Sequence, residues 1–476
     1  VAGCLVCSEM CIRDRVKRFM VRENLREAEL PIDVFYDLPM FRLQGETSPE
    51  MEYLCHGVNL GNRAFHGKVN MILLRDPDTG EESLLLGAGS NNLSRAGWWD
   101  NIECQHWEEI KSGLVPRRLI NLVQEDLAFL SNYRSFYEVD KVSALDRIAE
   151  FLDTCRGSRS ADPVYYYGLS FHEYRRSFID FLSKSPSPLM QYSNWRLEII
   201  SPFFADDVGN TEHQAFFDMG IEEIKLFLPF DNEGSALCQD TYYQHIQKEE
   251  GIEWAQWRED LARALGVNGE YFRRLHAKVY HFYNHRQSWV FVGSVNFTYK
   301  AIHENVEAGF LAKLGKSGPL LEAIPDKVVI DKFETLEEEV PADSGEQDQD
   351  IAFPELHLCY DWLSKCLTGR TAKRHSYEIE ILSSEGDAVI APWIVKYQEE
   401  GYAGDTQALE KVLRNGSLVK VRGRNIQHKG KTAFPAHPVL LQQIGWSHKP
   451  LDLPKLSAAQ ILAIYSGMSA ERRQMM

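Results

Sequence analysis

Two stretches of the chain, far apart in the sequence, carry the same polar residues at the same spacing. In each, a histidine is followed two positions later by a lysine, and a serine is followed two positions later by an asparagine and eleven positions after that by a glutamate. Only the interval from lysine to serine differs, at 22 and 16 positions. The two sets are His66, Lys68, Ser90, Asn92 and Glu103, and His276, Lys278, Ser294, Asn296 and Glu307. One His-x-Lys triplet is weak evidence, but a duplicate with matched offsets indicates function.

These residue types are the ones that cleavage of a phosphodiester requires. One neutral imidazole can attack phosphorus to form a phosphohistidine, and a second, protonated imidazole can give its proton to the leaving oxygen and then activate water. The reference pKa of histidine is about 6.5, so both forms are accessible near neutral pH. We expect Lys68 and Lys278 to hold the non-bridging phosphate oxygens, and the amides of Asn92 and Asn296 to add hydrogen-bond donors.

The serines and glutamates suit supporting roles around such a centre. We expect Ser90 and Ser294 to fix neighbouring geometry, and Glu103 and Glu307 to accept a hydrogen bond from the far ring nitrogen of a histidine, which sets its tautomer. The reaction requires no cofactor and no metal ion, because two lysines supply the charge that metal ions supply in other nucleases. No Asp/Glu/His cluster occurs at a ligand spacing such as HExxH.

Structural interpretations of the same residues stay open. Both sets can be polar residues that are satisfied within buried strands, one copy can be degenerate, and Glu103 and Glu307 can be ordinary surface carboxylates. Neither copy, however, has lost its histidine, lysine or asparagine. The matched offsets favour the functional interpretation.

The histidines and lysines lie in patterns typical of β-strands. Side chains two apart on a strand point to the same face, so a strand over 66–74 places His66 and Lys68 together, and the same holds for His276 and Lys278. Apolar runs and periodicity predict further strands at 32–36, 84–86, 197–200, 224–228 and 289–292, and helices at 119–130, 144–152 and 174–182.

The N-terminal part of the chain departs from the pattern of the second half. No counterpart of the strand at 197–200 precedes His66, and we expect that an outer strand of the first half was lost with the native N-terminus. Residues 1–15, VAGCLVCSEMCIRDR, lack an initial Met and resemble translated sequencing adapter, as in a metagenomic fragment. This segment is therefore interpreted as non-native.

The composition is that of a globular protein, with 44% hydrophobic and 25% charged residues. No run of about eighteen apolar residues occurs, so no integral membrane segment is predicted. Three of the nine cysteines lie within residues 1–15 and the other six are scattered singly, which favours reduced thiols in the cytoplasm. The net charge of −17 disfavours nucleic acid, but residues 331–350 alone contribute −8, from nine acids and one lysine. The net charge therefore says little about the site.

The region after this acidic segment is predicted to be a small β-rich domain. Residues 377–381 alternate apolar and charged side chains as a half-exposed strand does, and Asn415-Gly416 between two apolar pairs is a hairpin signal. Residues 411–431 carry seven Lys or Arg and no acid, which suits either nucleic-acid phosphates or a solvated hairpin face. A closing helix is predicted from Ser457 to Gly467.

Other residues near the two sets have candidate roles. Arg63 and Arg273 each lie three positions before a histidine of the sets, an offset that points them away from it on a strand and favours a structural role. Six aromatic residues near the predicted strand ends can stack bases, contact lipid chains or belong to the core. They are Trp98, Trp99, Phe203, Phe204, Phe297 and Tyr299.

Both copies resemble the HxK…GSxN…E motif of the phospholipase D superfamily, in which one motif from each half contributes to a single active site. The resemblance covers roughly residues 25–315. The aspartate expected five positions after each lysine is Leu73 in the first copy and Tyr283 in the second. Loss of aspartate with asparagine retained resembles the HKN-type tyrosyl-DNA phosphodiesterase branch. The nucleophile of this family is usually in the first half, which implies His66, with His276 as general acid and base.

The resemblance implies an α/β fold with two phospholipase D-like α/β/α repeats that form one pseudo-symmetric catalytic unit. A C-terminal β-rich accessory domain follows. The predicted boundaries are 1–15 for the adapter-derived segment, 16–110 for the first, N-terminally truncated repeat, 111–190 for a helical insert, 191–320 for the second repeat, 321–352 for an acidic linker, and 353–476 for the accessory domain with its C-terminal helix.

The leading functional hypothesis is a metal-independent phosphoric diester hydrolase. It would act on nucleic acid, as a nuclease or an end-processing enzyme of DNA repair, through a phosphohistidine intermediate. A phospholipase D or phosphatidyl transferase acting on lipid uses the same chemistry and is the first alternative. The second alternative is a catalytically silent module that binds nucleic acid or protein.

Overall fold

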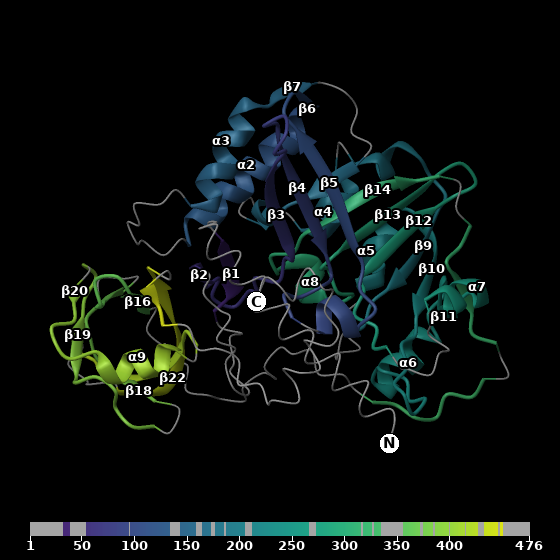
Figure 1. Cartoon of the computed structure of the whole chain (residues 1–476). Helices are drawn as coiled ribbons and strands as arrows, with labels where there is room; N and C mark the ends of the chain where they lie inside the picture. The colour runs from purple at the N-terminus through teal and green to yellow at the C-terminus, as the bar shows by residue number, and fades with distance from the viewer. Residues whose placement is uncertain are drawn as a thin grey trace, which may run out of the picture.

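The computed structural model describes residues 32–38, 54–94, 96–133, 143–158, 164–172, 177–184, 187–204, 212–265, 273–315, 318–325, 328–334, 356–371, 375–383, 386–398, 400–414, 416–426, 433–445 and 448–450. They form a mixed α/β structure with several sheets (Figure 1). The segment 1–15 and the helix predicted from Ser457 to Gly467 lie outside the described residues. Among the helices that are described, none is both long and apolar enough to cross a membrane.

The largest sheet has eight strands, in the order β15-β11-β10-β9-β12-β13-β14-β8. These strands are β8 (Val164–Tyr167), β9 (Trp195–Ile200), β10 (Ile221–Phe227), β11 (Ile252–Trp257), β12 (Val279–Tyr283), β13 (Ser288–Gly293), β14 (Gly309–Leu314) and β15 (Leu321–Ala323). The strands β9, β10 and β11 are parallel, whereas β12, β13 and β14 form an antiparallel meander. Leu197, Ile199 and Leu226 are fully buried, as expected for strands covered on both faces.

The first half contains two smaller sheets. The strands β1 (Asp33–Asp37) and β2 (Leu54–Val58) are parallel, and β3 (Val69–Arg75), β4 (Glu82–Gly89) and β5 (Gln105–Lys111) form an antiparallel meander. Within the described part of the chain, no strand joins these two sheets. In the second half, β9 lies between β10 and β12 and is therefore a central strand of its sheet. The prediction that an outer strand of the first half was lost concerns a part of the chain outside the described residues.

Helices α4 (Phe178–Ser183) and α5 (Glu212–Asp218) pack on one face of the eight-stranded sheet through aromatic contacts, and α8 (Tyr299–His303) packs against α4. The rings of Phe178 on α4 and Phe216 on α5 lie 4.9 and 5.9 Å from the ring of Tyr280 on β12. These contacts fix the strand that directly follows Lys278.

The range 111–190, predicted to be helical, contains both helices and strands. Its longer helices are α2 (Arg117–Ser131) and α3 (Ala144–Thr154), and α3 begins at a capping box of Ser143 and Asp146. The short strands β6 (Leu114–Pro116) and β7 (Arg156–Ser158) pair with each other, and β8 joins the eight-stranded sheet beside β14. The remaining short elements are η1 (Ala96–Asp100), η2 (Leu169–His172), η3 (Pro188–Gln191), α6 (Asp240–Ile246) and α7 (Glu259–Ala264).

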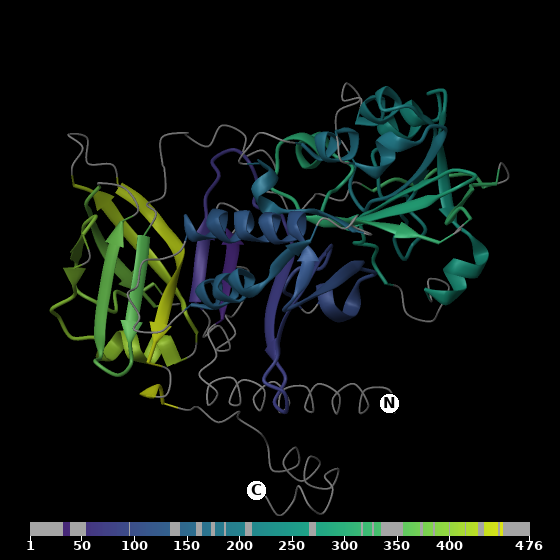
Figure 2. The ribbon, with the colours of Figure 1, turned by 90° about the horizontal axis from the view of Figure 1, so that it is seen from above.

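A seven-stranded sheet with its own hydrophobic core follows the acidic segment. It consists of β16 (Leu356–Asp361), β17 (Cys366–Thr371), β18 (Tyr377–Leu382), β19 (Trp393–Val395), β20 (Glu400–Gly401), β21 (Leu418–Asn425) and β22 (Ala433–Ile444), with helix α9 (Gln407–Arg414). In Figure 2 this sheet and the eight-stranded sheet lie at opposite sides of the first half, and β22 contacts β2.

The hairpin predicted at Asn415-Gly416 is wrong. Helix α9 ends at Arg414 before this dipeptide, and strand β21 follows it. Leu409 and Leu413, four positions apart, are both fully buried, so the helical period of the apolar residues outweighs the local turn signal.

The basic stretch at 411–431 is partly neutralised within the sheet. On β21, Arg422 and Arg424 form ion pairs with Glu380 and Glu378 of β18. These pairs favour the interpretation as a solvated strand face over a contact with nucleic-acid phosphates.

Candidate active site

The two antiparallel meanders place the repeated residues at equivalent positions. Val69 pairs with Ala88 and Val279 with Val292, so in both halves the residue after the lysine stands opposite the residue two before the serine. The next ladder matches as well, because Gly89 pairs with Gln105 and Gly293 with Gly309. The equal offsets in the sequence therefore correspond to an equal register in space.

Each histidine precedes its strand and pairs with the other half of the molecule. The prediction of a continuous strand over 66–74 is wrong, since β3 begins only at Val69. The backbone amide of His66 donates to the carbonyl of Val306 at 2.8 Å, and that of His276 donates to Ile102 at 2.9 Å. Val306 immediately precedes Glu307, and Ile102 immediately precedes Glu103. Each histidine therefore lies beside the glutamate of the opposite copy.

Two crossed histidine–glutamate pairs result. The Nδ1 atom of His66 lies 2.8 and 3.0 Å from the carboxylate oxygens of Glu307, and Nδ1 of His276 lies 2.8 and 2.9 Å from those of Glu103. A carboxylate only accepts hydrogen bonds, so Nδ1 carries the proton in each ring. The Nε2 atom of each neutral imidazole then has a lone pair that can act as a base or a nucleophile.

The serines hold the glutamates in place. The Ser90 hydroxyl donates to Glu103 and accepts from the amide of Cys104 at 2.9 Å. In the second half, Ser294 donates to Glu307 in the same way and accepts from the amide of Ala308. The predicted supporting residues are thus brought together, with each serine joined to the glutamate of its own copy.

The lysines lie beside the two histidines. The Nζ atom of each lysine donates to the backbone carbonyl of the histidine two positions before it, at 2.7 Å in both halves. Nζ of Lys278 also lies 2.9 Å from Nε2 of His276, and this side chain is fully buried. The ring of Phe203 flanks the pair, with its centroid 5.8 Å from Nζ of Lys278 and 6.3 Å from the ring of His276.

Burial and mutual repulsion of the cations shift the titration of the site. Burial lowers the pKa of His66 well below its usual value, and the positive charges of Lys68 and Lys278 add to this effect. Burial also lowers the pKa of His276 to about 4, although its hydrogen bond with Glu103 opposes the shift. The pKa of Lys278 falls to about 7, because of burial and then the charge of Lys68. An anion between the lysines would relieve the repulsion, which makes the site suited to phosphate.

The asparagines are placed differently in the two halves. Asn296 is 1% exposed, whereas the side chain of Asn92 is exposed, with no hydrogen bond to any residue that the structure describes. The chain after Ser90 turns outward, with the carbonyl of Asn92 accepting from the amide of Ser94 at 2.8 Å. The structure thus gives Asn296 a place in the interior and leaves the side chain of Asn92 at the surface.

The other candidate residues divide into core, surface and bridging groups. Phe297 is fully buried and forms a backbone bridge with Phe204, which indicates a role in packing. Trp98 and Tyr299 are exposed. Nη2 of Arg273 donates to the carbonyl of Asn101 at 2.6 Å, which links the two halves and agrees with the structural role expected for it.

Two further contacts at the site were not anticipated from the sequence. The side-chain amide (Nδ2) of Asn101 donates to Oε1 of Glu103 at 3.3 Å, and the thiol of Cys104 donates to the backbone carbonyl of Lys278 at 3.3 Å. Both residues flank a motif glutamate, and that position was the only signal in the sequence that could have drawn attention to them.

No protein-family model matches the sequence, and no curated protein matches it. Among solved structures, this chain is similar to a mutant of yeast tyrosyl-DNA phosphodiesterase 1, with a TM-score of 0.38 and 10% identity over 60% of this chain and 83% of that one. It is also similar to polyphosphate kinase from Porphyromonas gingivalis, with a TM-score of 0.29 and 12% identity over 60% of this chain and 36% of the other.

Proposed function

We propose that this protein is a phosphodiesterase that hydrolyses phosphodiester bonds through two histidines, one from each copy of the repeated motif. The observation that carries the proposal is the pair of crossed hydrogen bonds, His66 to Glu307 and His276 to Glu103. Such pairs orient an imidazole and fix its tautomer, and two of them beside two lysines form a centre for general acid and nucleophilic catalysis. The two copies would then form one pseudo-symmetric catalytic unit of the phospholipase D type.

The first chemical step would be attack by Nε2 of His66 on phosphorus. The N–P bond forms as the bond from phosphorus to the leaving oxygen breaks, and His276 gives its Nε2 proton to that oxygen. In the free protein the low pKa of His276 favours the neutral ring. Bound phosphate offsets the charges of Lys68 and Lys278, raises this pKa and allows His276 to bind the proton that it delivers.

The second step would be hydrolysis of the phosphohistidine. Neutral His276 takes a proton from water, the oxygen of that water attacks phosphorus, and the N–P bond breaks to return His66 to its neutral form. The lysines hold the non-bridging oxygens through both steps, and Asn296 supplies a donor from the interior. The carboxylates of Glu103 and Glu307 would stabilise the imidazolium form of their partners.

Nucleic acid is the substrate class we propose. Trp98 and Tyr299 are exposed, and they follow the two motif serines by eight and five positions. Exposed aromatic rings near a phosphate site can stack bases without selecting a sequence. The enzyme would act on strands or on blocked ends.

The direct test incubates the purified chain in EDTA with labelled single-stranded DNA, duplex DNA, 3′-tyrosyl DNA and phosphatidylcholine. We expect product from a nucleic-acid substrate, and its loss in His66→Ala and His276→Ala. His106→Ala is a matched control, because His106 is 29% exposed like His66 and also pairs with a carboxylate, Glu108, at 2.6 Å. Unchanged turnover in His66→Ala would refute the proposed site. Product from phosphatidylcholine alone would show that the substrate is a lipid and not nucleic acid.

A further inference from the structure

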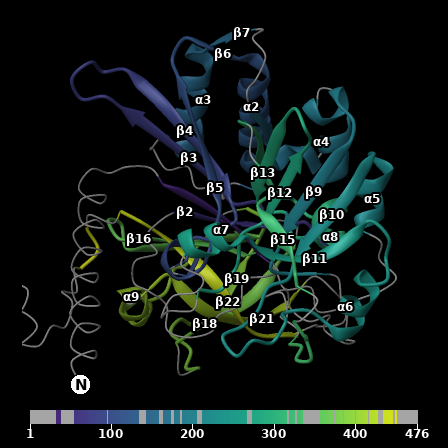
Figure 3. The same ribbon diagram turned by 90° about the vertical axis from the view of Figure 1, so that its right-hand side faces the viewer.

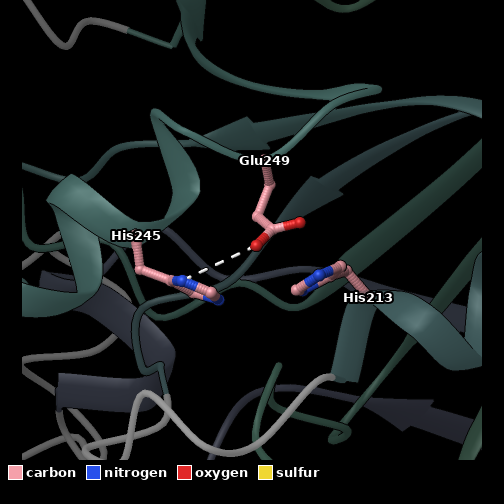
Figure 4. A group of neighbouring side chains, drawn as sticks. All are labelled: His213, His245 and Glu249. Carbon is pink, nitrogen blue, oxygen red and sulfur yellow. Dashed lines mark ion pairs between the residues drawn. The ribbon is translucent and has the colours of Figure 1, made fainter.

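A second cluster of chemically reactive side chains lies outside the repeated motifs. His213 is on α5, His245 is on α6, and Glu249 is in the turn that follows α6. One donor atom from each lies within 4.8 Å of the other two, and the imidazoles face each other beneath the carboxylate (Figure 4). No local spacing in the sequence joins these residues, because they come from two separate helices and the turn after the second.

The histidines of this cluster have unused ring nitrogens. Nδ1 of His213 and Nε2 of His245 are buried and have no hydrogen-bond partner in the described part of the chain. His213 is only 3% exposed. Buried nitrogens without partners are costly in a folded protein, and a ligand that they both bind would remove that cost.

The spacing of the cluster suits a metal ion better than an internal ion pair. Nδ1 of His245 lies 3.7 Å from Oε1 of Glu249, which is too long for a good hydrogen bond. Tetrahedral zinc has ligand bonds of about 2.0–2.1 Å, which puts its donor atoms roughly 3.4 Å apart. Small side-chain rotations would therefore bring the three donors into the first coordination sphere of one ion.

We propose that His213, His245 and Glu249 form a binding site for one zinc ion. Two imidazoles and one carboxylate favour zinc over magnesium or calcium, which prefer oxygen ligands. The fourth position would be taken by water, since the Glu249 side chain is 40% exposed. Figure 3 places α5 and α6 on the part of the sheet that carries β9, β10 and β11, and the ion would tie these two helices together.

The zinc site would serve stability, separately from the phosphodiesterase chemistry. The ring of Phe216 on α5 lies 5.9 Å from Tyr280, two positions after Lys278, so α5 supports the strand behind the second lysine. Binding to the folded state alone stabilises it and raises the midpoint of thermal unfolding, by an amount that grows with the logarithm of the free zinc concentration. The proposal does not depend on the phosphodiesterase function.

The test uses the full chain stripped with EDTA, dialysed, and titrated with zinc chloride. We expect one tight equivalent by calorimetry, a rise in Tm, and a tetrahedral visible spectrum when Co²⁺ is substituted. Glu249→Gln should weaken zinc binding about 10–100-fold, and His213→Ala by about 100-fold or more. His285→Asn, which removes an exposed histidine outside the cluster, should change none of these readouts.

Several results distinguish this site from other zinc-binding histidines. A His66→Ala/His276→Ala double variant should still bind one zinc ion tightly. Loss of this zinc ion in the double variant would assign it to the phosphate centre and overturn the proposal. Absence of a stoichiometric equivalent in the unaltered chain would also overturn it. If circular dichroism shows that His213→Ala is unfolded, the conservative Glu249→Gln variant decides, and unchanged zinc affinity in that variant counts against the cluster.

Discussion

The two histidine–glutamate pairs have the same hydrogen bonds but different access to solvent. His66 is 29% exposed and its partner Glu307 is fully buried, whereas His276 and Glu103 are 14% and 11% exposed. The lysines differ in the same sense, since Lys278 is fully buried and Lys68 is half-buried. An equal register therefore produces two half-sites of unequal environment, and this inequality allows two chemically identical residues to take different roles.

The contact between Lys278 and His276 strengthens this difference. Nζ of Lys278 lies on the Nε2 side of His276, at 2.9 Å, in the position from which that ring would exchange a proton with substrate or water. A lone pair that accepts from an ammonium group is a poor nucleophile. This difference supports the proposed mechanism, in which the more exposed His66 attacks phosphorus and His276 transfers protons.

The largest expected effect comes from removing either histidine. His66→Ala and His276→Ala should each reduce kcat/KM by about 1,000-fold or more, because each removes one of two coupled catalytic groups. The two variants differ in what accumulates with a substrate whose leaving group needs no proton, such as a p-nitrophenyl phosphodiester. His276→Ala should trap a phosphoryl adduct on His66, which mass spectrometry of the peptide would detect. An adduct on His276 in His66→Ala, and none in the converse variant, would reverse the roles.

The second prediction concerns pH and Lys278. The pKa of this lysine is lowered to about 7, so its positive charge is present below about pH 7 and is lost as the pH rises through that value. We expect KM for a phosphodiester to rise above about pH 7. Lys278→Arg keeps the charge at all of these pH values and should shift the rise in KM to higher pH, whereas Lys278→Met should weaken binding at every pH. If KM still rises above about pH 7 in Lys278→Arg, the rise belongs to the titration of another group.

The glutamates should show a smaller but graded effect. Glu307→Gln and Glu103→Gln keep the shape of the side chain but remove the charge that stabilises an imidazolium, and we expect losses in kcat of about 10–100-fold. The loss should be larger for Glu307, because that carboxylate is fully buried and less screened by water. Steady-state kinetics of both variants, with a check of fold by circular dichroism, measures the difference. Equal losses would show that burial of the carboxylate does not separate the half-sites.

The asparagines should give the smallest effect and the clearest contrast between the halves. Asn296→Ala removes a buried amide and should lower kcat by about 10-fold or more. Asn92→Ala changes an exposed side chain, and we expect turnover within about twofold of the unaltered chain and stability within about 0.5 kcal/mol. A loss in Asn92→Ala as large as that in Asn296→Ala would mean that the loop after β4 closes over the substrate.

The sequence predicted the members of the candidate site because their offsets are local. The intervals from histidine to lysine and from serine to glutamate are set by strand, turn and strand, and the register of each meander preserves them. The pairing of each histidine with the glutamate of the other copy was not predictable in this way. His66 and Glu307 are 241 positions apart, and their contact depends on how the two halves pack. The exposure of Asn92 likewise depends on the path of the chain after β4.

The fold was predictable where apolar periodicity is strong. The strands at 197–200, 224–228 and 289–292 correspond to β9, β10 and β13. Prediction failed where a local signal competed with packing, as at Asn415-Gly416, where burial of Leu409 and Leu413 extends a helix to the turn. It also placed His66 on a strand, whereas that residue pairs with the opposite half before β3 begins.

The crossed hydrogen bonds have a consequence for how the two copies can change over time. A substitution at Glu307 alters the histidine of the first copy, and one at Glu103 alters the histidine of the second. Under the proposed function, the loss of a glutamate from one copy of the motif would therefore impair the histidine of the other copy. The two sets of residues would then be constrained together during evolution.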